Sequence, residues 1–218
     1  MVSFSNDTDV LKYEPILFGE LHPPQQVLAT GIGGTLSGTT FTASGADFIS
    51  AQVAAGGVIY LRSEDGVLDG AYEIVSVDSA TQLSVSVIRA DSQTQAIAPP
   101  AADDVFYRIS TFGPQANEAG FDLTEYFGIG PGNPASEIQA EDIMDADVLR
   151  RASTFAVISS AYAMLAGNSE DEHFWRKSLH YQNLFTKARE RCRLSIDIGS
   201  EGIVDVTKVG ASGKLVRD

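Results

Sequence analysis

Cysteine, long apolar runs and N-terminal basic residues are all scarce in this sequence. The single cysteine, Cys192, excludes an intrachain disulfide and a zinc site built from several thiolates. No stretch reaches the roughly 18 apolar residues of a membrane span, and the first ten residues lack the basic and apolar segments of a secretory signal. We therefore expect a soluble protein that suits a reducing compartment and does not enter a membrane.

Positive charge is especially scarce toward the N-terminus. Residues 1–140 hold 4 Lys and Arg against 17 Asp and Glu, whereas residues 141–218 hold 11 against 12. Phosphate binding requires clustered positive charge, so free nucleic acid is not expected as a ligand of the N-terminal part. An acidic surface fits a protein that stays in solution, or one that lines a channel without holding DNA.

A long helical pattern is present near the C-terminal end. Residues 147–166 contain no Pro or Gly, and their apolar and small side chains recur three or four positions apart, which predicts one amphipathic helix. After a turn that begins at Gly167, residues 169–193 predict a second helix, with an apolar stripe that Trp175 widens. Two long helices joined by so short a turn predict an antiparallel hairpin.

The segment between residues 27 and 110 has a different texture. Thr, Ser, Val and Gly dominate it, and apolar residues alternate with polar ones. We expect strands over residues 35–42, 57–63, 70–77, 82–89 and 104–110. Short strands with a turn about every ten residues predict a small antiparallel barrel or sandwich. The fold class is therefore α+β, with the β domain inserted into a helical one.

The helical domain is predicted to take the chain on both sides of this insertion. Residues 1–26 would contribute a short amphipathic helix over residues 9–21. Residues 111–193 would contribute the long hairpin, preceded by one or two helical turns at residues 121–127. Residues 194–218 alternate again and predict a hairpin-like extended tail. Since this tail has no evident partner within the chain, we expect it to dock on another subunit.

Three patterns suggest chemistry, but each has a plainer interpretation. Glycine-rich residues 31–38 lack the Lys of a phosphate-binding loop and favour a flexible turn. His173 and His180 lie about 10 Å apart along a helix, too far for one metal ion. Residues 197–205 resemble a degraded calcium loop, but Gly199 interrupts the ligand series. We expect no metal, cofactor or catalytic site; a hydrolase built on scattered carboxylates is the remotest alternative.

Positive charge gathers on the second predicted helix. The cluster comprises Arg176, Lys177, Lys187, Arg189, Arg191 and Arg193. The plain interpretation is a solvated face with favourable charge near the helix C-terminus. The functional interpretation is an interface with an acidic neighbour, such as the next copy of this acidic protein or a partner. The tail residues predicted to join that interface are Ile203, Val204, Val206, Val209, Leu215 and Arg217.

Three segments resemble the head–tail adaptor, or connector, proteins of tailed bacteriophages. They are the helix at residues 9–21, the hairpin that starts at residues 147–166, and the tail with residues 197–205 followed by Leu215-Val216-Arg217. The match covers roughly half of the chain by general pattern. The β segment, with Gly57-Val58-Ile59-Tyr60, looks like the small β modules of phage virion proteins and departs from the nearly all-helical minimal adaptor.

The resemblance implies a structural protein of the virion neck that is made in the host cytoplasm. It implies a ring of about twelve copies beneath the portal, joining the capsid to the tail around the DNA channel. Its partners would be the portal protein and a downstream neck or tail protein. Genomic DNA would pass through the ring without sequence-specific binding.

A second function stays open from the sequence alone. The β domain would then bind a glycan or another ligand, or decorate the virion surface. This hypothesis predicts an exposed aromatic cluster formed by Tyr60, Tyr72, Phe106 and Tyr107. The plainer interpretation places those four rings in the core.

Overall fold

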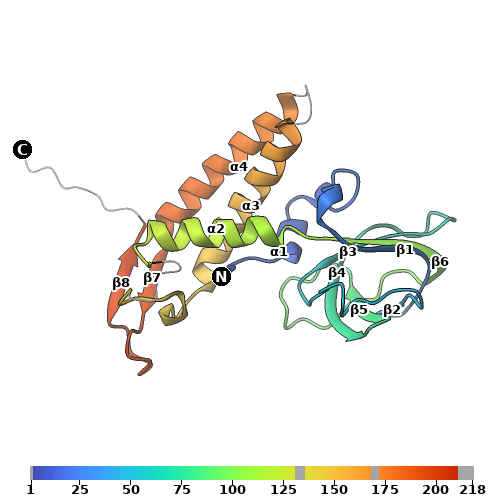
Figure 1. The fold of residues 1–218 in the computed structure, drawn as a ribbon, viewed down its shortest axis with the longest axis horizontal. Coiled ribbons are helices and arrows are strands. Elements are labelled where there is room, and N and C mark those ends of the chain that lie inside the picture. The colour runs from blue at the N-terminus through green and yellow to red at the C-terminus, as the bar shows by residue number, and fades with distance from the viewer. Residues whose placement is uncertain (1, 131–135, 168–171, 211–218) are drawn as a thin grey trace, which may run out of the picture. The chain divides into compact units, whose positions relative to one another are not determined.

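The computed structural model describes residues 2–130, 136–167 and 172–210. The chain divides into two compact units (Figure 1). The barrel unit is Asn6–Phe112, and the helical unit comprises Met1–Ser5 and Gly113–Asp218. The α+β class is confirmed, with a closed antiparallel barrel in one unit and helices with a two-stranded sheet in the other.

The barrel unit closes six described strands in the order β1-β2-β5-β4-β3-β6, with β6 pairing back onto β1. The strands are β1 (Val27–Ser37), β2 (Thr40–Thr42), β3 (Val58–Arg62), β4 (Asp69–Ser79), β5 (Gln82–Ser86) and β6 (Ala102–Ser110). All neighbours are antiparallel, so the barrel prediction is confirmed. The single strand expected over residues 35–42 is wrong, because the chain reverses at Gly38 (φ +60°) between β1 and β2.

The barrel interior is filled by aromatic rings that need space on β1. The rings of Phe41 and Tyr107 meet edge to face at 5.3 Å between centroids. A Cβ on Gly31 would lie 2.7 Å from Tyr107 Oη, and a Cβ on Gly34 would lie 2.6 Å from Phe41 Cε2. The glycine-rich residues 31–38 therefore lie mostly within a strand, where they make room for rings. Both the flexible turn and the phosphate loop are wrong for this segment.

Replacing Gly34 by alanine should destabilise the barrel. The new methyl group would overlap the Phe41 ring and lie 3.2 Å from the Val105 carbonyl, so the core must shift. We expect Gly34→Ala to lower the free energy of unfolding by about 1–3 kcal/mol in urea titrations. Gly45→Ala is the matched control, since its Cβ would meet no atom within 4 Å and should change stability by less than about 0.5 kcal/mol. Equal effects of the two substitutions would contradict this account of the core.

The strand expected over residues 82–89 ends early because Arg89 folds back onto β4. β5 stops at Ser86, and Val87 is 40% exposed. The Arg89 guanidinium donates to Glu73 through Nη2 at 2.6 Å and through Nε at 3.1 Å. Both side chains are only 7% exposed. A buried pair of this geometry is costly to break from one side, so it holds the segment after β5 against the barrel.

The N-terminal helix expected over residues 9–21 is two shorter elements, α1 (Asp7–Leu11) and η1 (Pro15–Leu17). Asn6 caps α1 by accepting a hydrogen bond from the Asp9 N–H at 3.0 Å. Pro15 begins η1, because proline fits the first helical turn but not a helix interior. These elements belong to the barrel unit, so the expected grouping of residues 1–26 with the helical domain holds only for residues 1–5.

Asp7 links the start of the barrel unit to its end. Its carboxylate accepts a hydrogen bond from the Phe112 N–H at 2.7 Å and a further one from the Thr111 side chain. Burial raises the pKa of Asp7 from 3.8 to about 6, against the lowering effect of those two donors. The folded barrel unit therefore favours the protonated carboxyl.

This raised pKa predicts a pH dependence of stability with a definite sign. Between about pH 4 and pH 6 the folded state binds a proton that the unfolded state has lost, so Asp7 lowers stability as pH rises, by up to about 3 kcal/mol. Asp7→Asn should remove this term, and the variant should gain stability relative to wild type between pH 4 and pH 7 in urea titrations.

Asp47→Asn is the control, because the contribution of Asp47 to stability should change with pH in the opposite direction to that of Asp7. The Ser50 N–H and hydroxyl donate to Asp47 and hold its pKa below the ordinary value. Its stabilising effect is present at neutral pH and is lost as pH falls through the folded-state pKa. An Asp7→Asn difference that stays constant between pH 4 and pH 7 would contradict the burial of a strained carboxylate at this position.

In the helical unit, the predicted hairpin corresponds to α3 (Asp147–Gly167) and α4 (Glu172–Arg191). The boundaries of both helices agree with the expected ones to within three residues, and residues 168–171, where the turn is expected, lie outside the described part. The expected one or two turns at residues 121–127 are instead a full helix, α2 (Gly113–Tyr126), and η3 spans Ala140–Asp142. Glycine is a poor helix former, so Gly120 hid the full length of α2 in the sequence. The structure requires glycine at this position, because a Cβ there would collide with the Val2 carbonyl.

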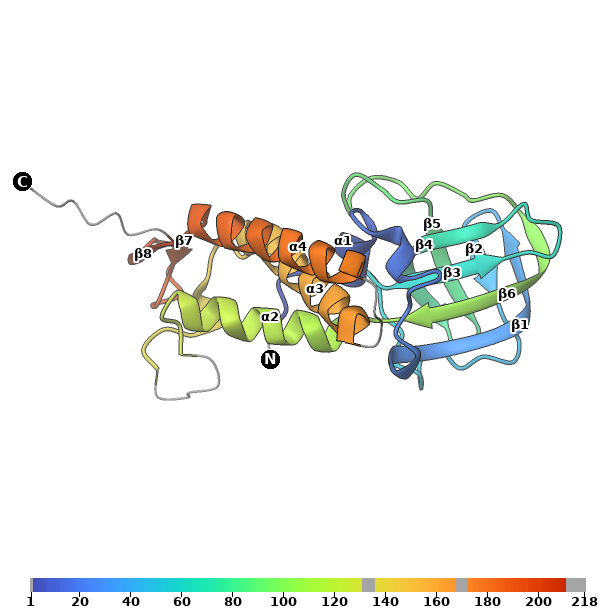
Figure 2. The same ribbon diagram turned by 90° about the horizontal axis from the view of Figure 1, so that it is seen from above.

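Helix α3 is buried on more sides than one stripe would allow. It packs against both α2 and α4 (Figure 2). Ser153, Val157 and Ile158 are therefore buried in addition to Leu149 and Phe155. On α4 the predicted stripe is largely confirmed by the burial of Ser178 and Tyr181, but Trp175 is 54% exposed and does not widen it. None of the described helices is long and apolar enough to cross a membrane.

The tail forms a hairpin within its own chain. β7 (Arg193–Ile196) pairs antiparallel with β8 (Val206–Val209). Leu194 and Ile196 are fully buried and complete the core of the helical unit. The expectation that the tail lacks an internal partner is therefore wrong for residues 193–209, although its hairpin form is confirmed. Leu215 and Arg217 lie outside the described residues.

Candidate interaction groove between helices α3 and α4

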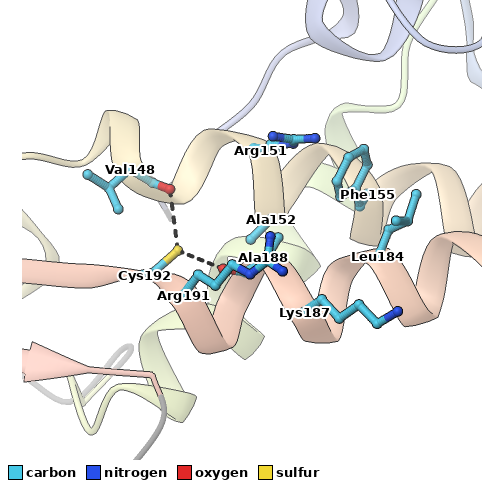
Figure 3. A pocket seen from close by; sticks show the side chains of 9 residues that line it. All are labelled: Val148, Arg151, Ala152, Phe155, Leu184, Lys187, Ala188, Arg191 and Cys192. Atoms are coloured by element: carbon cyan, nitrogen blue, oxygen red, sulfur yellow. Dashed lines mark hydrogen bonds between the residues drawn. The ribbon is translucent and has the colours of Figure 1, made fainter.

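A groove of about 380 Å³ runs between α3 and α4 (Figure 3). Its lining comprises Val148, Arg151, Ala152 and Phe155 from α3 with Leu184, Lys187, Ala188, Arg191 and Cys192 from α4 and its end. The antiparallel pairing explains why residues about 40 positions apart face each other. The groove lies entirely within the helical unit.

The groove combines an apolar floor with a positive rim. Ala152 and Cys192 are buried at the floor, whereas Arg151, Lys187 and Arg191 are exposed. No lining residue is acidic. The ion pairs found among the described residues involve none of these three cations. The Arg151 guanidinium also lies over the Phe155 ring, 5.4 Å from its centroid. The charge of Lys187 and Arg191, and the outer side of the Arg151 guanidinium, are therefore available to an external acidic group.

The packing at the groove floor keeps Cys192 unreactive. Its thiol lies 3.4 Å from the Val148 carbonyl and 3.3 Å from the Ala188 carbonyl, both within hydrogen-bonding distance (Figure 3). Burial, together with the negative charge of Asp145, raises the pKa of the thiol above its ordinary value. The thiol is buried, and this cysteine is a packing residue.

The predicted basic cluster does not form a single surface. Arg176 pairs with Glu172 at 2.9 Å, and the Lys177 ammonium donates to the Tyr162 hydroxyl at 2.8 Å. The Arg189 guanidinium stacks 3.8 Å from the centroid of the Tyr126 ring on α2. Arg193 is exposed on β7.

Only Lys187 and Arg191 of the predicted cluster line the groove, and Arg151 of α3 joins them. Sequence reasoning missed Arg151 because it considered charge along one helix at a time. The antiparallel hairpin it predicted does bring the start of α3 beside the end of α4, so the register of the hairpin was the signal that could have found it.

The predicted tail residues fall into an exposed set and a packed one. Ile203 is 64% exposed, Val204 47% and Val209 57%, whereas Val206 packs against the core of the helical unit. Ile203 and Val204 belong to the tip of the β7–β8 hairpin, which we define as residues 197–205. The tip thus presents aliphatic side chains to solvent.

The hairpin tip is held in shape by two carboxylates. Asp197 accepts hydrogen bonds from the N–H groups of Glu201 at 3.1 Å and Gly202 at 2.6 Å. Asp205 accepts one from the Ile198 N–H at 2.9 Å. The acidic residues that suggest a calcium loop therefore bind backbone donors. Within the described residues, no group of three or more His, Cys, Asp or Glu is placed to hold a metal ion.

The aromatic cluster expected on the barrel is divided between its two faces. Tyr107 is 4% exposed in the barrel core, and Tyr72 packs against that core. Tyr60 and Phe106 neighbour each other at 6.5 Å between centroids on β3 and β6. The Arg108 guanidinium lies 5.0 Å from the Tyr60 centroid, so the pair is partly covered by a cation. The four rings do not form one surface.

Comparison with protein-family models, curated proteins and solved structures found no match for this chain.

The geometry of the groove predicts that the Cys192 thiol reacts slowly with disulfide reagents. A disulfide reagent such as DTNB should modify the native protein at least about tenfold more slowly than the urea-unfolded protein, because the thiol is buried and its thiolate disfavoured. A Ser160→Cys variant in a Cys192→Ala background provides the control, since Ser160 is exposed on α3. That control should react rapidly when folded. Rapid native labelling of Cys192 would contradict the described floor.

Proposed function

We propose that this chain is a ring-forming structural adaptor of the phage head–tail type, joining a capsid portal to a downstream neck or tail protein. The observation that carries the proposal is the α3–α4 groove, a site of uncompensated positive charge in a chain of net charge −14. A surface of this kind complements the acidic remainder of an identical neighbour. A repeated contact between unlike surfaces of identical subunits generates a ring when the rotation closes.

The helical unit has the properties that a ring wall requires. Helix α3, 21 residues long, is packed between two other helices, which gives a rigid element about 30 Å long. The hairpin tip is exposed and structured, so it is suited to contact a neighbour without a large ordering cost. The proposed partners are further copies of this chain, the portal and the next neck or tail protein.

The charge distribution supports passage of DNA without binding. Residues 1–140 carry 17 acidic residues against 4 basic ones, so DNA phosphates would be repelled from a channel lined by this part of the chain. The proposed location is the neck of the virion, after synthesis in the host cytoplasm. The role is structural and requires no cofactor.

The glycan-binding or decoration alternative has less support. Carbohydrate platforms use open aromatic faces, whereas the Phe106 ring has the Arg62 guanidinium 5.4 Å from its centroid and Tyr60 has Arg108 at 5.0 Å. Tyr107, another member of the expected cluster of four, lies inside the barrel. No observation favours this alternative over the adaptor.

The proposed function predicts assembly into a closed ring. Native mass spectrometry and negative-stain imaging of the full chain, alone and mixed with a portal protein, should reveal rings of about twelve copies. Raising the salt concentration should weaken assembly, because the contact is proposed to join opposite charges. A protein that remains monomeric up to about 100 µM and ignores the portal would contradict the proposal.

A further inference from the structure

The tip of the β7–β8 hairpin matches the α3–α4 groove in chemistry. The tip exposes Ile198, Ile203 and Val204, by 43%, 64% and 47%, and it contains three acidic residues. The groove offers an apolar floor with three cations at its rim. The two surfaces are complementary. The aliphatic side chains of the tip can be buried on the apolar floor of the groove, and its acidic residues can pair with the cations at the rim.

We infer that the groove of one copy receives the hairpin tip, residues 197–205, of a second copy of this chain. The inference rests on the proposed function and deepens it by naming the contact that builds the ring. Ile203 and Val204 enter the groove beside Leu184 and Ala188, which line it and are partly exposed. Glu201 meets the rim cations, because Asp197 and Asp205 already accept backbone N–H groups within the tip.

The occupant must come from another copy. In Figures 1 and 2 the β7–β8 hairpin extends beyond the end of α4, and its connecting loop points away from the two helices. A chain therefore does not place its tip in its own groove. Since tip and groove are different surfaces of the same unit, each copy donates one and accepts one. Such a head-to-tail contact gives a closed ring of two or more copies when the rotation closes, and an open filament when it does not.

The size and charge of the groove favour this occupant over others. Its volume of about 380 Å³ falls within the range of about 300–1,000 Å³ typical of small binding pockets, which suits a few side chains. A free phosphate would use the cations but would leave the apolar floor wet. The C-terminal residues 211–218 carry Lys214 and Arg217 against one Asp, so their charge does not complement the rim.

Two variants of the full chain test this contact by complementation. The groove variant is Lys187→Glu/Arg191→Glu, and the tip variant is Ile203→Ser/Val204→Ser; all four positions are exposed, so folding should be retained. Each variant alone should lose self-association by at least about tenfold at about 100 µM, measured by sedimentation velocity. Arg176→Glu on the same helix but outside the groove should assemble like wild type.

Mixing the two variants gives the distinctive result. The intact tip of the groove variant fits the intact groove of the tip variant, whereas the reciprocal contact is absent. The mixture should therefore form one-to-one dimers and no rings. Wild-type assembly by both variants, or a mixture that stays monomeric, would overturn the inference.

Disulfide trapping separates failure of the contact from failure of the ring. In a Cys192→Ala background, Val204→Cys and Leu184→Cys proteins are mixed and oxidised, and cross-linked pairs should accumulate. Ser160→Cys replaces Leu184→Cys as the control outside the groove and should give at least about tenfold less product. Cross-linked pairs without closed rings would support the contact and overturn the adaptor. Rings that persist in both variants, without specific cross-links, would overturn the contact and leave the adaptor standing.

Discussion

The close approach of α3 to α4 is the constraint on which the helical unit depends. The Ser159 hydroxyl donates to the Ser178 carbonyl at 3.0 Å, and the Ser178 hydroxyl donates to the Ser159 carbonyl at 3.0 Å. Small hydroxyl side chains at both positions let the two backbones come together while their polar groups stay bonded. The groove lies between the same two helices and is lined by both large and small side chains, including Phe155, Leu184, Ala152 and Ala188.

The two units have separate cores that are built by different means. The barrel core consists of residues from its strands and loops, with aromatic rings filling the space opposite Gly31 and Gly34. The helical core draws on distant parts of the chain, since Phe4, Leu149 and Leu194 all belong to it. Ser5 contributes a hydroxyl contact to Ser153 at 2.7 Å. The barrel segment is therefore inserted between residue 5 and residue 113 of the helical unit.

The helical unit contains both the basic groove rim and the exposed aliphatic side chains of the hairpin tip. Several basic residues of this unit have partners within it: Arg176 pairs with Glu172, and Arg189 lies over the Tyr126 ring. Lys187 and Arg191 at the groove rim take part in none of the ion pairs among the described residues. An acidic, aliphatic hairpin tip on the same unit supplies the complementary surface. The proposed contact between copies rests on this complementarity.

The sequence by itself determined the elements whose stability is local. The period of α3 and α4, the alternation in β3 to β6 and the α+β class were all readable, because helix and strand periodicity depend on neighbouring residues. The tertiary structure decided the role of Gly34 beside Phe41, the length of α2 and the internal docking of Leu194, since each depends on residues far away in the chain. It also decided the groove. Arg151 and Arg191 became one rim only when two helices packed side by side, so their proximity follows from the register of the hairpin and not from their separation along the chain.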